Sequence, residues 1–240
     1  VTNLAKAHLE CHGTTEAYHA IKARIIDTLA PNGCLVANAD DERVRRLIPR
    51  HPGPSMTAGL KQNADLTATP VERGLFGQTV LLRAGGHVAP LSLATPVASF
   101  ARDALFAAAV GLRYRVPLER ITRGLEAAGT VAGRMERIDR GQEMAVFLDR
   151  PTSGHALATT LASLRRLAPG RLVMLAEEGI AASLGEGCRF TIRAARWCDE
   201  TIVVPGGVVD DQPGDEAAAD RKSTRLNSSH SSVSRMPSSA

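Results

Sequence analysis

Short apolar segments alternate with helix-like stretches along this chain, and this alternation limits its fold more than any other feature. The apolar run 33–38 lies between a helix predicted to start at Thr14 or Thr15 and a second helix predicted over 41–48. The same order recurs beyond residue 138, in predicted strands at 144–149, 171–176 and 201–205 and predicted helices at 155–167 and 191–197. Such alternation is typical of a parallel, Rossmann-like sheet covered by helices. The sequence therefore predicts an α/β fold, with the strand at 144–149 buried.

A second pattern predicts antiparallel strands in the middle of the chain. The β-rich segments 78–83 and 87–93 are separated by the pair Gly85-Gly86, which favours a tight hairpin turn. Two helices are predicted to follow, over 98–112 and 117–127. We therefore expect an antiparallel excursion at the edge of a largely parallel sheet.

Composition narrows the class of protein further. Because only 3% of the residues are aromatic while 44% are apolar, the core has to be built from Ala, Leu, Val and Ile. No run of about 18 apolar residues is present and no signal peptide is visible, so neither a membrane partner nor secretion is expected. The cysteines show neither C-x-x-C spacing nor a disulfide framework, which favours a reducing cytoplasm. They are Cys11, Cys34, Cys188 and Cys198.

The formal charge of +4 comes mainly from the end of the chain. Residues 220–240 hold four basic side chains and one acidic side chain, so the rest is close to neutral and no nucleic-acid partner is expected. Residues 211–240 are expected to form a disordered tail, because the segment is rich in serine and lacks periodicity. From about residue 220 it reads like the translation of a sequencing adapter, and we assign it no function.

Side chains that can bind metal or phosphate crowd the first 22 residues. They stand before or on a predicted helix, and they are Thr2, Asn3, His8, His12, Tyr18 and Lys22. Gly13 is expected to adopt a backbone conformation that other residues avoid, in the turn that leads into the helix. Two histidines four residues apart could suggest zinc. Glu10 stands one position too late for the H-E-x-x-H pattern, however, so a zinc site is not expected.

The helix that carries Lys22 has a four-residue apolar spacing. Its expected buried stripe is Ala17, Ile21, Ile25 and Leu29. Lys22 would lie at the edge of this stripe, where burial favours a neutral amine. From these residues alone, Lys22 could also be an ordinary solvated lysine. Asn38 or Asp40 is expected to cap the next helix, which gives these polar groups a structural role before a catalytic one.

Taken together, these motifs make the chain resemble the Mur ligases, ATP-dependent enzymes that add amino acids to a UDP-linked muramyl peptide. The family pattern T-N-L-x-x-D-H-L-D-x-H-G, followed by Y-x-x-x-K, is matched at residues 2–22 with Ala7 and Glu10 in place of two aspartates. The family's N-A-D-D occurs at 38–41 and its G-R-M-E at 133–136. The combination most resembles the branch that adds the third residue, the UDP-N-acetylmuramyl-tripeptide synthetases.

The resemblance implies an ATP- and Mg²⁺-dependent amide-bond ligase of peptidoglycan precursor synthesis. Such an enzyme makes an acyl phosphate, which the incoming amine displaces. The implied substrates are a UDP-N-acetylmuramyl peptide and an amino acid. His8 and Lys22 would hold the metal, with Lys22 converted by CO₂ to a carbamate. Arg134 would contact the γ-phosphate and Asp149 the nucleotide ribose, so Lys22, His8 and Arg134 are the predicted catalytic residues.

The resemblance also implies a division into domains. Residues 1–137 would be the C-terminal part of the P-loop-type central ATP-binding domain, and residues 138–210 part of a Rossmann-like C-terminal domain. No G-x-x-x-x-G-K-[ST] phosphate loop occurs in the chain. In the family this loop and the UDP-binding region lie upstream, so this fragment alone is expected to be inactive.

At some positions of the family pattern this chain has a different residue type, and these differences leave a second interpretation of its function open. The family's G-x-F-N-x-x-N helix start, whose asparagines approach the nucleotide base, corresponds to Val97, Phe100 and Asp103. The residues after Asp149 and the later glycine-rich loop also depart from the family pattern. These differences favour a degenerate, non-catalytic homologue that acts as a binding or scaffold partner. A relative of the folate or cyanophycin ligases is a third interpretation, which the opening motif fits less well.

Overall fold

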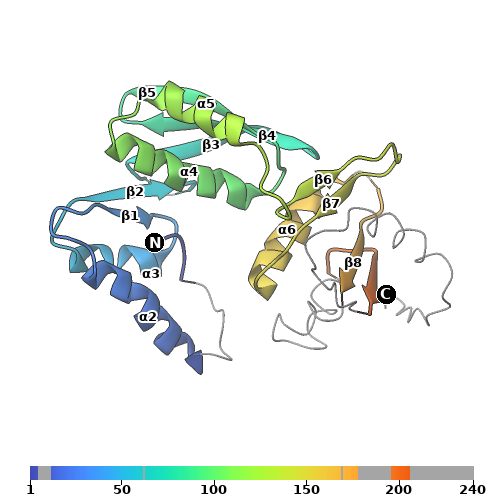
Figure 1. Ribbon diagram of the computed structural model, residues 1–240, viewed down its shortest axis with the longest axis horizontal. Coiled ribbons are helices and arrows are strands. Elements are labelled where there is room, and N and C mark those ends of the chain that lie inside the picture. The colour runs from blue at the N-terminus through green and yellow to red at the C-terminus, as the bar shows by residue number, and fades with distance from the viewer. Residues whose placement is uncertain (5–11, 62, 169, 178–195, 206–240) are drawn as a thin grey trace, which may run out of the picture. The chain divides into compact units, whose positions relative to one another are not determined.

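The computed structural model describes residues 1–4, 12–61, 63–168, 170–177 and 196–205 (Figure 1). The chain divides into two compact units, residues 1–170 and 171–240. The first unit contains a five-stranded sheet with its helices and a small two-stranded sheet, and the second contains a pair of strands. The domain boundary predicted near residue 138 stays a prediction.

The five-stranded sheet of the first unit has the strand order β1-β2-β3-β4-β5. Its strands are β1 (Leu35–Asn38), β2 (Ser55–Gly59), β3 (Leu66–Gly74), β4 (Gly77–Ala84) and β5 (His87–Leu93). The first three strands pair in parallel, and β4 pairs antiparallel with both β3 and β5. Gly85 takes the positive φ of 57° that the turn between β4 and β5 requires. This arrangement confirms the predicted α/β class with its antiparallel excursion.

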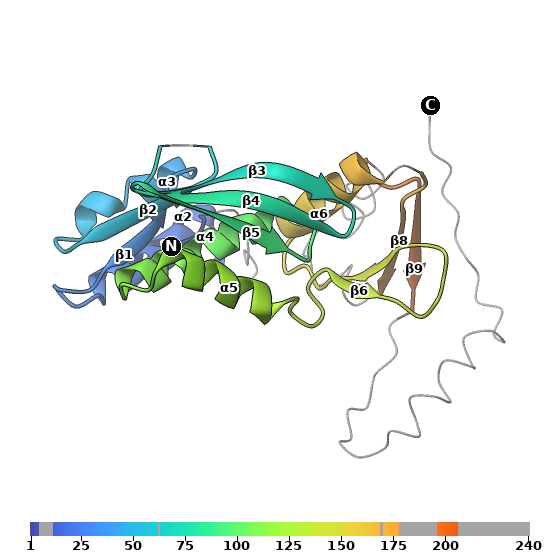
Figure 2. The same ribbon diagram turned by 90° about the horizontal axis from the view of Figure 1, so that it is seen from above.

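Helices α4 (Ala98–Arg113) and α5 (Leu118–Ala128) cover one face of this sheet (Figures 1 and 2). Alternate residues of β4, including Val80 and Leu82, point into the core beneath them. The buried face of α4 is rich in alanine, which lets the helix lie close to the strands. The buried alanines are Ala101, Ala104, Ala108 and Ala109. A core of small aliphatic side chains is what the low aromatic content predicts.

Helix α2 (Thr15–Asp27) packs beside β1 through a face that differs from the predicted one. Ile21 and Ile25 are 49% and 56% exposed, whereas Tyr18, Ala23 and Ile26 are buried. Each residue turns by about 100° on an α-helix, so the line of Ile21 and Ile25 lies about 100° around the helix from the line of Tyr18 and Ile26. A second small core decides which side is buried; it consists of Leu4, Ile26, Leu35, Ala37 and Val44.

Two short helical segments follow β1. Helix α3 (Glu42–Arg45) begins after Asp41, which caps it by accepting a hydrogen bond from the amide of Arg43 at 2.9 Å. The 3₁₀ helix η1 (Ile48–Arg50) follows. The expectation that Asn38 or Asp40 caps this helix is therefore wrong, because both side chains bond elsewhere, as described below.

The rest of the first unit consists of β6 (Glu136–Ile138), β7 (Val146–Leu148) and α6 (Gly154–Leu167). β6 and β7 pair antiparallel as a two-stranded sheet, so the expectation that the strand at 144–149 belongs to a parallel sheet is wrong. The buried strand predicted at 144–149 is shorter than expected and mostly exposed, because both Val146 and Leu148 contact solvent. An exposed two-stranded ribbon offers no second layer for these side chains to pack against. Helix α6 agrees with its predicted range and is capped by Ser153.

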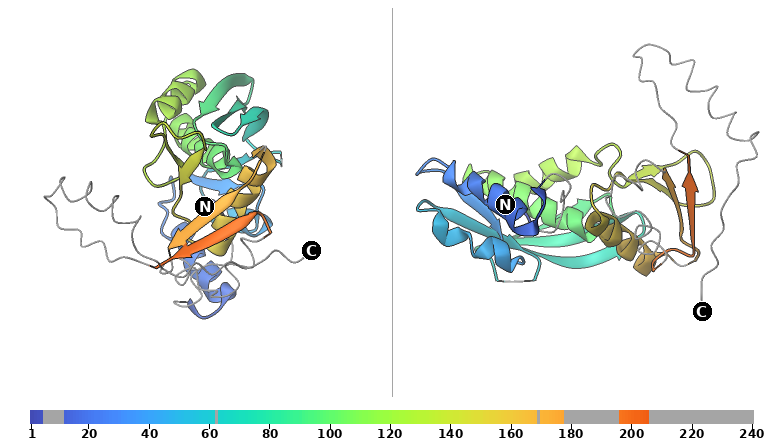
Figure 3. Two further views of the ribbon diagram at one scale, coloured as in Figure 1. Left: turned by 90° about the vertical axis from the view of Figure 1, so that its right-hand side faces the viewer. Right: turned by 90° about the horizontal axis from the view of Figure 1, so that it is seen from below.

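In the second unit, β8 (Val173–Glu177) and β9 (Glu200–Val204) run side by side in parallel (Figure 3). Their pairing confirms the parallel strands predicted at 171–176 and 201–205. Asp199 accepts a hydrogen bond from the amide of Leu172 at 2.6 Å and so joins the starts of the two strands. Of the helix predicted at 191–197, residues 191–195 lie outside the described residues and 196–197 form a turn. Across the described residues, no helix is both long and apolar enough to cross a membrane.

Candidate functional site

The entry into α2 places the residues of the opening motif. Gly13 has a φ of 71°, a left-handed conformation that glycine adopts without steric cost. The Thr14 side chain then caps the helix by accepting a hydrogen bond from the amide of Ala17 at 3.1 Å. Both predictions for this turn are confirmed: the special conformation of Gly13 and a threonine cap.

Lys22 lies on the side of α2 that faces the start of the chain. Its Nζ atom donates a hydrogen bond to the carbonyl oxygen of Asn3 at 3.3 Å and lies 4.9 Å from the centre of the Tyr18 ring. The rings of Tyr18 and His12 are 5.2 Å apart between centroids. Because Tyr18, Lys22 and Ile26 succeed one another four residues apart, Lys22 shares the half-buried side of the helix rather than the solvated one. The structure thus gathers Asn3, His12, Tyr18 and Lys22 into one cluster.

His8, the predicted metal partner of Lys22, lies outside the described residues, so the pair stays a prediction. Within the described ranges, no group of three or more His, Cys, Asp or Glu side chains is placed to hold a metal ion. A lysine amine is a poor ligand for Mg²⁺, which prefers oxygen. The donor set around Lys22 therefore suits Mg²⁺ only if this side chain gains an oxygen group.

The segment Thr2–Leu4 is held by side chains from a later part of the chain. The sequence alone did not connect these side chains with the site. Asn38 donates from Nδ2 to the carbonyl oxygen of Thr2 at 2.6 Å. Asp41 accepts from the amide of Leu4 at 3.0 Å, and Arg43 donates to the Leu4 carbonyl oxygen at 3.0 Å. The N-A-D-D motif thus anchors the T-N-L motif. In the sequence, the only signal for this contact between the two motifs was that both occur in the same chain.

Asp40, the remaining polar residue of that motif, connects β1 to the end of β2. Its carboxylate accepts hydrogen bonds from the amides of Leu60 at 2.7 Å and Lys61 at 2.9 Å. A side chain at Gly59 would crowd this contact, because a Cβ atom would lie 3.0 Å from Asp40 Oδ1 and 3.1 Å from the Cβ of Ala39. These contacts fit the structural role expected for the acids of this motif.

Arg134 and Asp149, the two predicted nucleotide contacts, belong to one cluster around the G-R-M-E turn. Asp149 accepts from the amide of Met135 at 3.2 Å and from the Thr160 hydroxyl at 3.1 Å, so it ties the turn to α6. Arg134 is exposed and donates to the carbonyl oxygen of Arg150 at 2.6 Å. A guanidinium has five N–H donors, and among the described residues one of them makes the hydrogen bond to Arg150.

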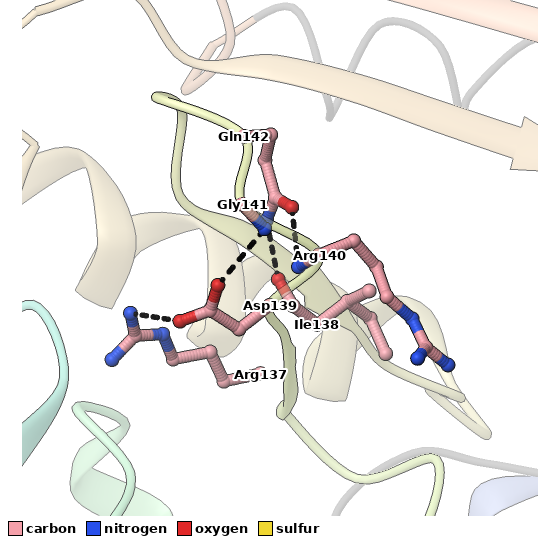
Figure 4. Close-up of polar contacts among 6 residues, drawn as sticks. All are labelled: Arg137, Ile138, Asp139, Arg140, Gly141 and Gln142. Atoms are coloured by element: carbon pink, nitrogen blue, oxygen red, sulfur yellow. Dashed lines mark hydrogen bonds and ion pairs between the residues drawn. The ribbon is translucent and has the colours of Figure 1, made fainter.

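The loop after this turn is held by its own polar groups (Figure 4). Asp139 pairs with Arg137 at 2.8 Å and also accepts from the amide of Gly141. Gln142 donates to the carbonyl oxygen of Ile138 at 2.5 Å and accepts from the amide of Arg140. The guanidinium of Arg137 lies 4.2 Å from the ring centre of Phe76, in the turn between β3 and β4. Arg137 therefore connects the G-R-M-E region to the main sheet.

The start of α4 is the region where the chain departs from the expected base-binding pattern. Val97 is buried and provides no side-chain cap. Gln78 fixes the approach to the helix, donating to the carbonyl oxygens of Thr95 at 3.0 Å and Val97 at 2.9 Å. Partial desolvation raises the pKa of the Asp103 carboxyl, and the nearby Arg102 guanidinium offsets part of this rise. An ionised carboxylate accepts hydrogen bonds only, so Asp103 lacks the N–H donors that an asparagine would offer there.

Comparison with known proteins agrees with these motifs. Residues 1–111 match the family model of the Mur ligase middle domain. The chain is 32% identical to a UDP-N-acetylmuramoyl-L-alanyl-D-glutamate–2,6-diaminopimelate ligase of Corynebacterium efficiens, over 91% of this chain and 41% of the relative. It is 30% identical to a UDP-N-acetylmuramyl-tripeptide synthetase of Roseiflexus, over 84% of this chain and 42% of the relative. The chain thus spans less than half the length of these relatives.

Solved structures share the fold. MurF from Acinetobacter baumannii superposes with a TM-score of 0.70 at 20% identity, covering 94% of this chain and 48% of that one. MurF from Thermotoga maritima, solved in complex with ADP, gives a TM-score of 0.70 at 20% identity, covering 84% of this chain and 47% of that one. The match of residues 1–111 to the family model, the relatives of 30% and 32% identity, and the motifs around Lys22 and Arg134 show that the chain belongs to the Mur ligase family.

Proposed function

We propose that the protein containing this chain is an ATP- and Mg²⁺-dependent ligase that joins an amino acid to a UDP-N-acetylmuramyl peptide. The observation that carries this proposal is the cluster in which Lys22 Nζ meets the Asn3 carbonyl oxygen beside Tyr18 and His12. Of these residues, Lys22 is the one to which the family resemblance assigns a metal ligand; its expected partner, His8, lies outside the described residues. The substrate is a cytoplasmic precursor of the cell wall.

Lys22 supplies the metal ligand in this proposal. Its amine, in the neutral form, adds to CO₂: the N–C bond forms, one proton leaves and an anionic carbamate results. The carbamate would provide an oxygen ligand of the kind that Mg²⁺ prefers, and the imidazole of His8 would be the second ligand that this chain offers. When bound, Mg²⁺ would offset the negative charge that develops on the phosphoryl oxygens.

Arg134 and Asp149 hold the nucleotide in this proposal. The exposed guanidinium of Arg134 has the planar donors that bind two phosphate oxygens at once. Each oxygen of Asp149 already accepts one hydrogen bond, and a carboxylate oxygen can accept a second, from a ribose hydroxyl. Asp149 would then set the position of the ribose relative to the turn that carries Arg134.

The identity of the added amino acid is a finer question. Relatives of similar identity include diaminopimelate ligases and also a UDP-N-acetylmuramate–L-alanine ligase from Saccharopolyspora erythraea, at 30%. We place the protein in the branch that adds the third residue, because the T-N-L, N-A-D-D and G-R-M-E motifs occur together.

The intact protein tests the proposal. Phosphate release from ATP is expected only when a UDP-muramyl peptide and an amino acid are both present, in a panel that includes diaminopimelate and L-alanine. Absence of turnover with every member of the panel would contradict the proposal.

A non-catalytic scaffold protein is the second candidate, and Asp103 is the observation that favours it. Its carboxylate stands where the family places a base-binding asparagine, and its raised pKa reflects an environment that disfavours the charge. Calorimetry with ATP distinguishes the two candidates. Binding that depends on Mg²⁺ supports the ligase, whereas no binding by the intact protein supports the scaffold.

A further inference from the structure

The backbone of residues 2–4 is held by side chains from distant parts of the chain. Asn38 binds the Thr2 carbonyl oxygen, and Asp41 and Arg43 bind the amide and the carbonyl oxygen of Leu4. The Asn3 carbonyl oxygen between them receives Lys22. Three of these contacts thus come from residues 38–43, and they lie on both sides of the Asn3 carbonyl group that accepts from Lys22.

Burial makes this anchoring rigid. Asn38 is 3% exposed, and its Oδ1 atom is also engaged, accepting from the amide of Asp40 at 2.8 Å. Leu4 is 2% exposed within the small core that includes Ile26 of α2. Hydrogen bonds hold Thr2 and Leu4, and the side chain of Leu4 is also packed in the core. The peptide unit of Asn3, which lies between these two residues, therefore has little freedom to rotate.

We propose that Asn38, Asp41 and Arg43 are positioning residues for Lys22, acting through the carbonyl group of Asn3. This inference rests on the proposed function and assigns these residues to the same metal site. They contact neither substrate nor metal. Their role is to direct the oxygen group of the modified lysine.

The chemistry of carbamylation explains how one carbonyl group can do this. When the neutral amine adds to CO₂, one N–H bond remains on Nζ, and it can keep donating to the Asn3 carbonyl oxygen. A carbamate C–N bond has the partial double-bond character of an amide, so its N–H and carboxylate lie in one plane. The same plane contains the Cε–Nζ bond of the lysine, so fixing the direction of the N–H relative to that bond fixes the plane of the carboxylate and turns its oxygens away from the Asn3 carbonyl.

Two arginines of the same segment form a matched pair for the test. Arg43 donates to the Leu4 carbonyl oxygen, whereas Arg46 pairs with Glu42 at 2.5 Å on the exposed side of α3. Arg43→Gln and Arg46→Gln each remove one positive charge, and only the first removes an anchor of residues 2–4. Arg43→Lys keeps a cationic donor, and Asn38→Asp keeps the shape while replacing the donor with an acceptor.

The measurement uses the intact protein in ¹³C-labelled bicarbonate, with the carbamate carbon observed by NMR and Lys22→Ala defining the background. At limiting CO₂, Arg43→Gln is expected to lower carbamate occupancy by about fivefold, the scale of losing one ordinary hydrogen bond, because the lost contact acts on Lys22 only through the backbone of residues 3 and 4. Arg46→Gln should match the wild type, and Arg43→Lys should recover part of the signal. Thermal unfolding is followed for each variant. If Asn38→Asp fails to fold, the two arginine variants still decide the question.

Two outcomes would overturn the inference: equal carbamate signals in Arg43→Gln and Arg46→Gln, or no signal from Lys22 in the wild-type protein. Either result leaves phosphate release to be judged independently. Conversely, a carbamate that forms without any ATP turnover would refute the ligase proposal while the positioning result stands.

Discussion

Asn38 reaches back across 36 residues and donates a hydrogen bond to the carbonyl oxygen of Thr2 at 2.6 Å. This contact joins two motifs of the sequence, one at the end of β1 and one at the start of the chain. The amide of Asn38 also donates to the Val1 carbonyl oxygen at 3.2 Å, so both its backbone and its side chain hold this segment. The end of β1 therefore holds the segment that contacts Lys22.

Replacement of Arg134 by lysine tests its role toward phosphate. Arg134→Lys keeps the charge but loses the planar donors, so in the intact protein we expect the KM for ATP to rise by about tenfold. The melting temperature should hardly change, because Arg134 is exposed. Arg140→Lys in the adjoining loop is the control, since the hydrogen bond recorded for that residue comes from its backbone amide. Equal KM values for the two variants would remove Arg134 from the nucleotide site.

Gly53 is a position where any side chain should be harmful. A Cβ atom there would lie 2.4 Å from the Pro31 carbonyl oxygen and 2.7 Å from Nε2 of His51, which bonds the Gly33 carbonyl oxygen at 2.8 Å. Gly53→Ala is therefore expected to lower the free energy of unfolding by about 1–3 kcal/mol, as overpacking does. Gly86→Ala, in open space, serves as the comparison in urea unfolding. A loss no larger than that of Gly86→Ala would show that this turn is loosely packed.

The carboxyl group of Asp103 should make stability depend on pH. Desolvation raises its pKa in the folded protein above the unfolded value, so the folded state binds the proton more tightly. This contribution to stability is present below the unfolded pKa and is lost as the pH rises through the folded pKa. Asp103→Asn should therefore melt at a higher temperature than the wild type at pH 7, and the difference should shrink toward pH 4. A difference that is constant over this range would contradict the assignment.

The contact between Arg137 and Phe76 should be measurable as a coupling energy. The guanidinium lies 4.2 Å from the ring centre, and Phe76 also lies 6.3 Å from the ring of Phe147 between centroids. A double-mutant cycle with Arg137→Gln and Phe76→Leu is expected to give about 0.5–1 kcal/mol, the value typical of exposed cation–π pairs. The same cycle with Arg140→Gln in place of Arg137→Gln should give a value near zero. Full additivity of the Arg137 and Phe76 changes would show that the contact contributes nothing.

Local patterns in the sequence were enough to place many elements. The pair Gly85-Gly86 identified the hairpin of β4 and β5, and Gly13 with Thr14 identified the start of α2. These signals work because turn conformation and helix capping depend on residues that are neighbours in the chain. The strand at 144–149 was less well predicted, since its apolar residues say nothing about whether a second layer covers them.

The sequence alone determined the order of helices and strands and the motifs that resemble the Mur ligases. Only the tertiary structure decided which face of α2 is buried, and hence that Lys22 turns toward Asn3 rather than toward water. It also decided that Asn38, Asp41 and Arg43 hold residues 2–4. The physical reason is distance along the chain. Turns and caps are set by residues a few positions apart, whereas these contacts join groups 19 to 39 positions apart, which meet only when the sheet and its core have formed.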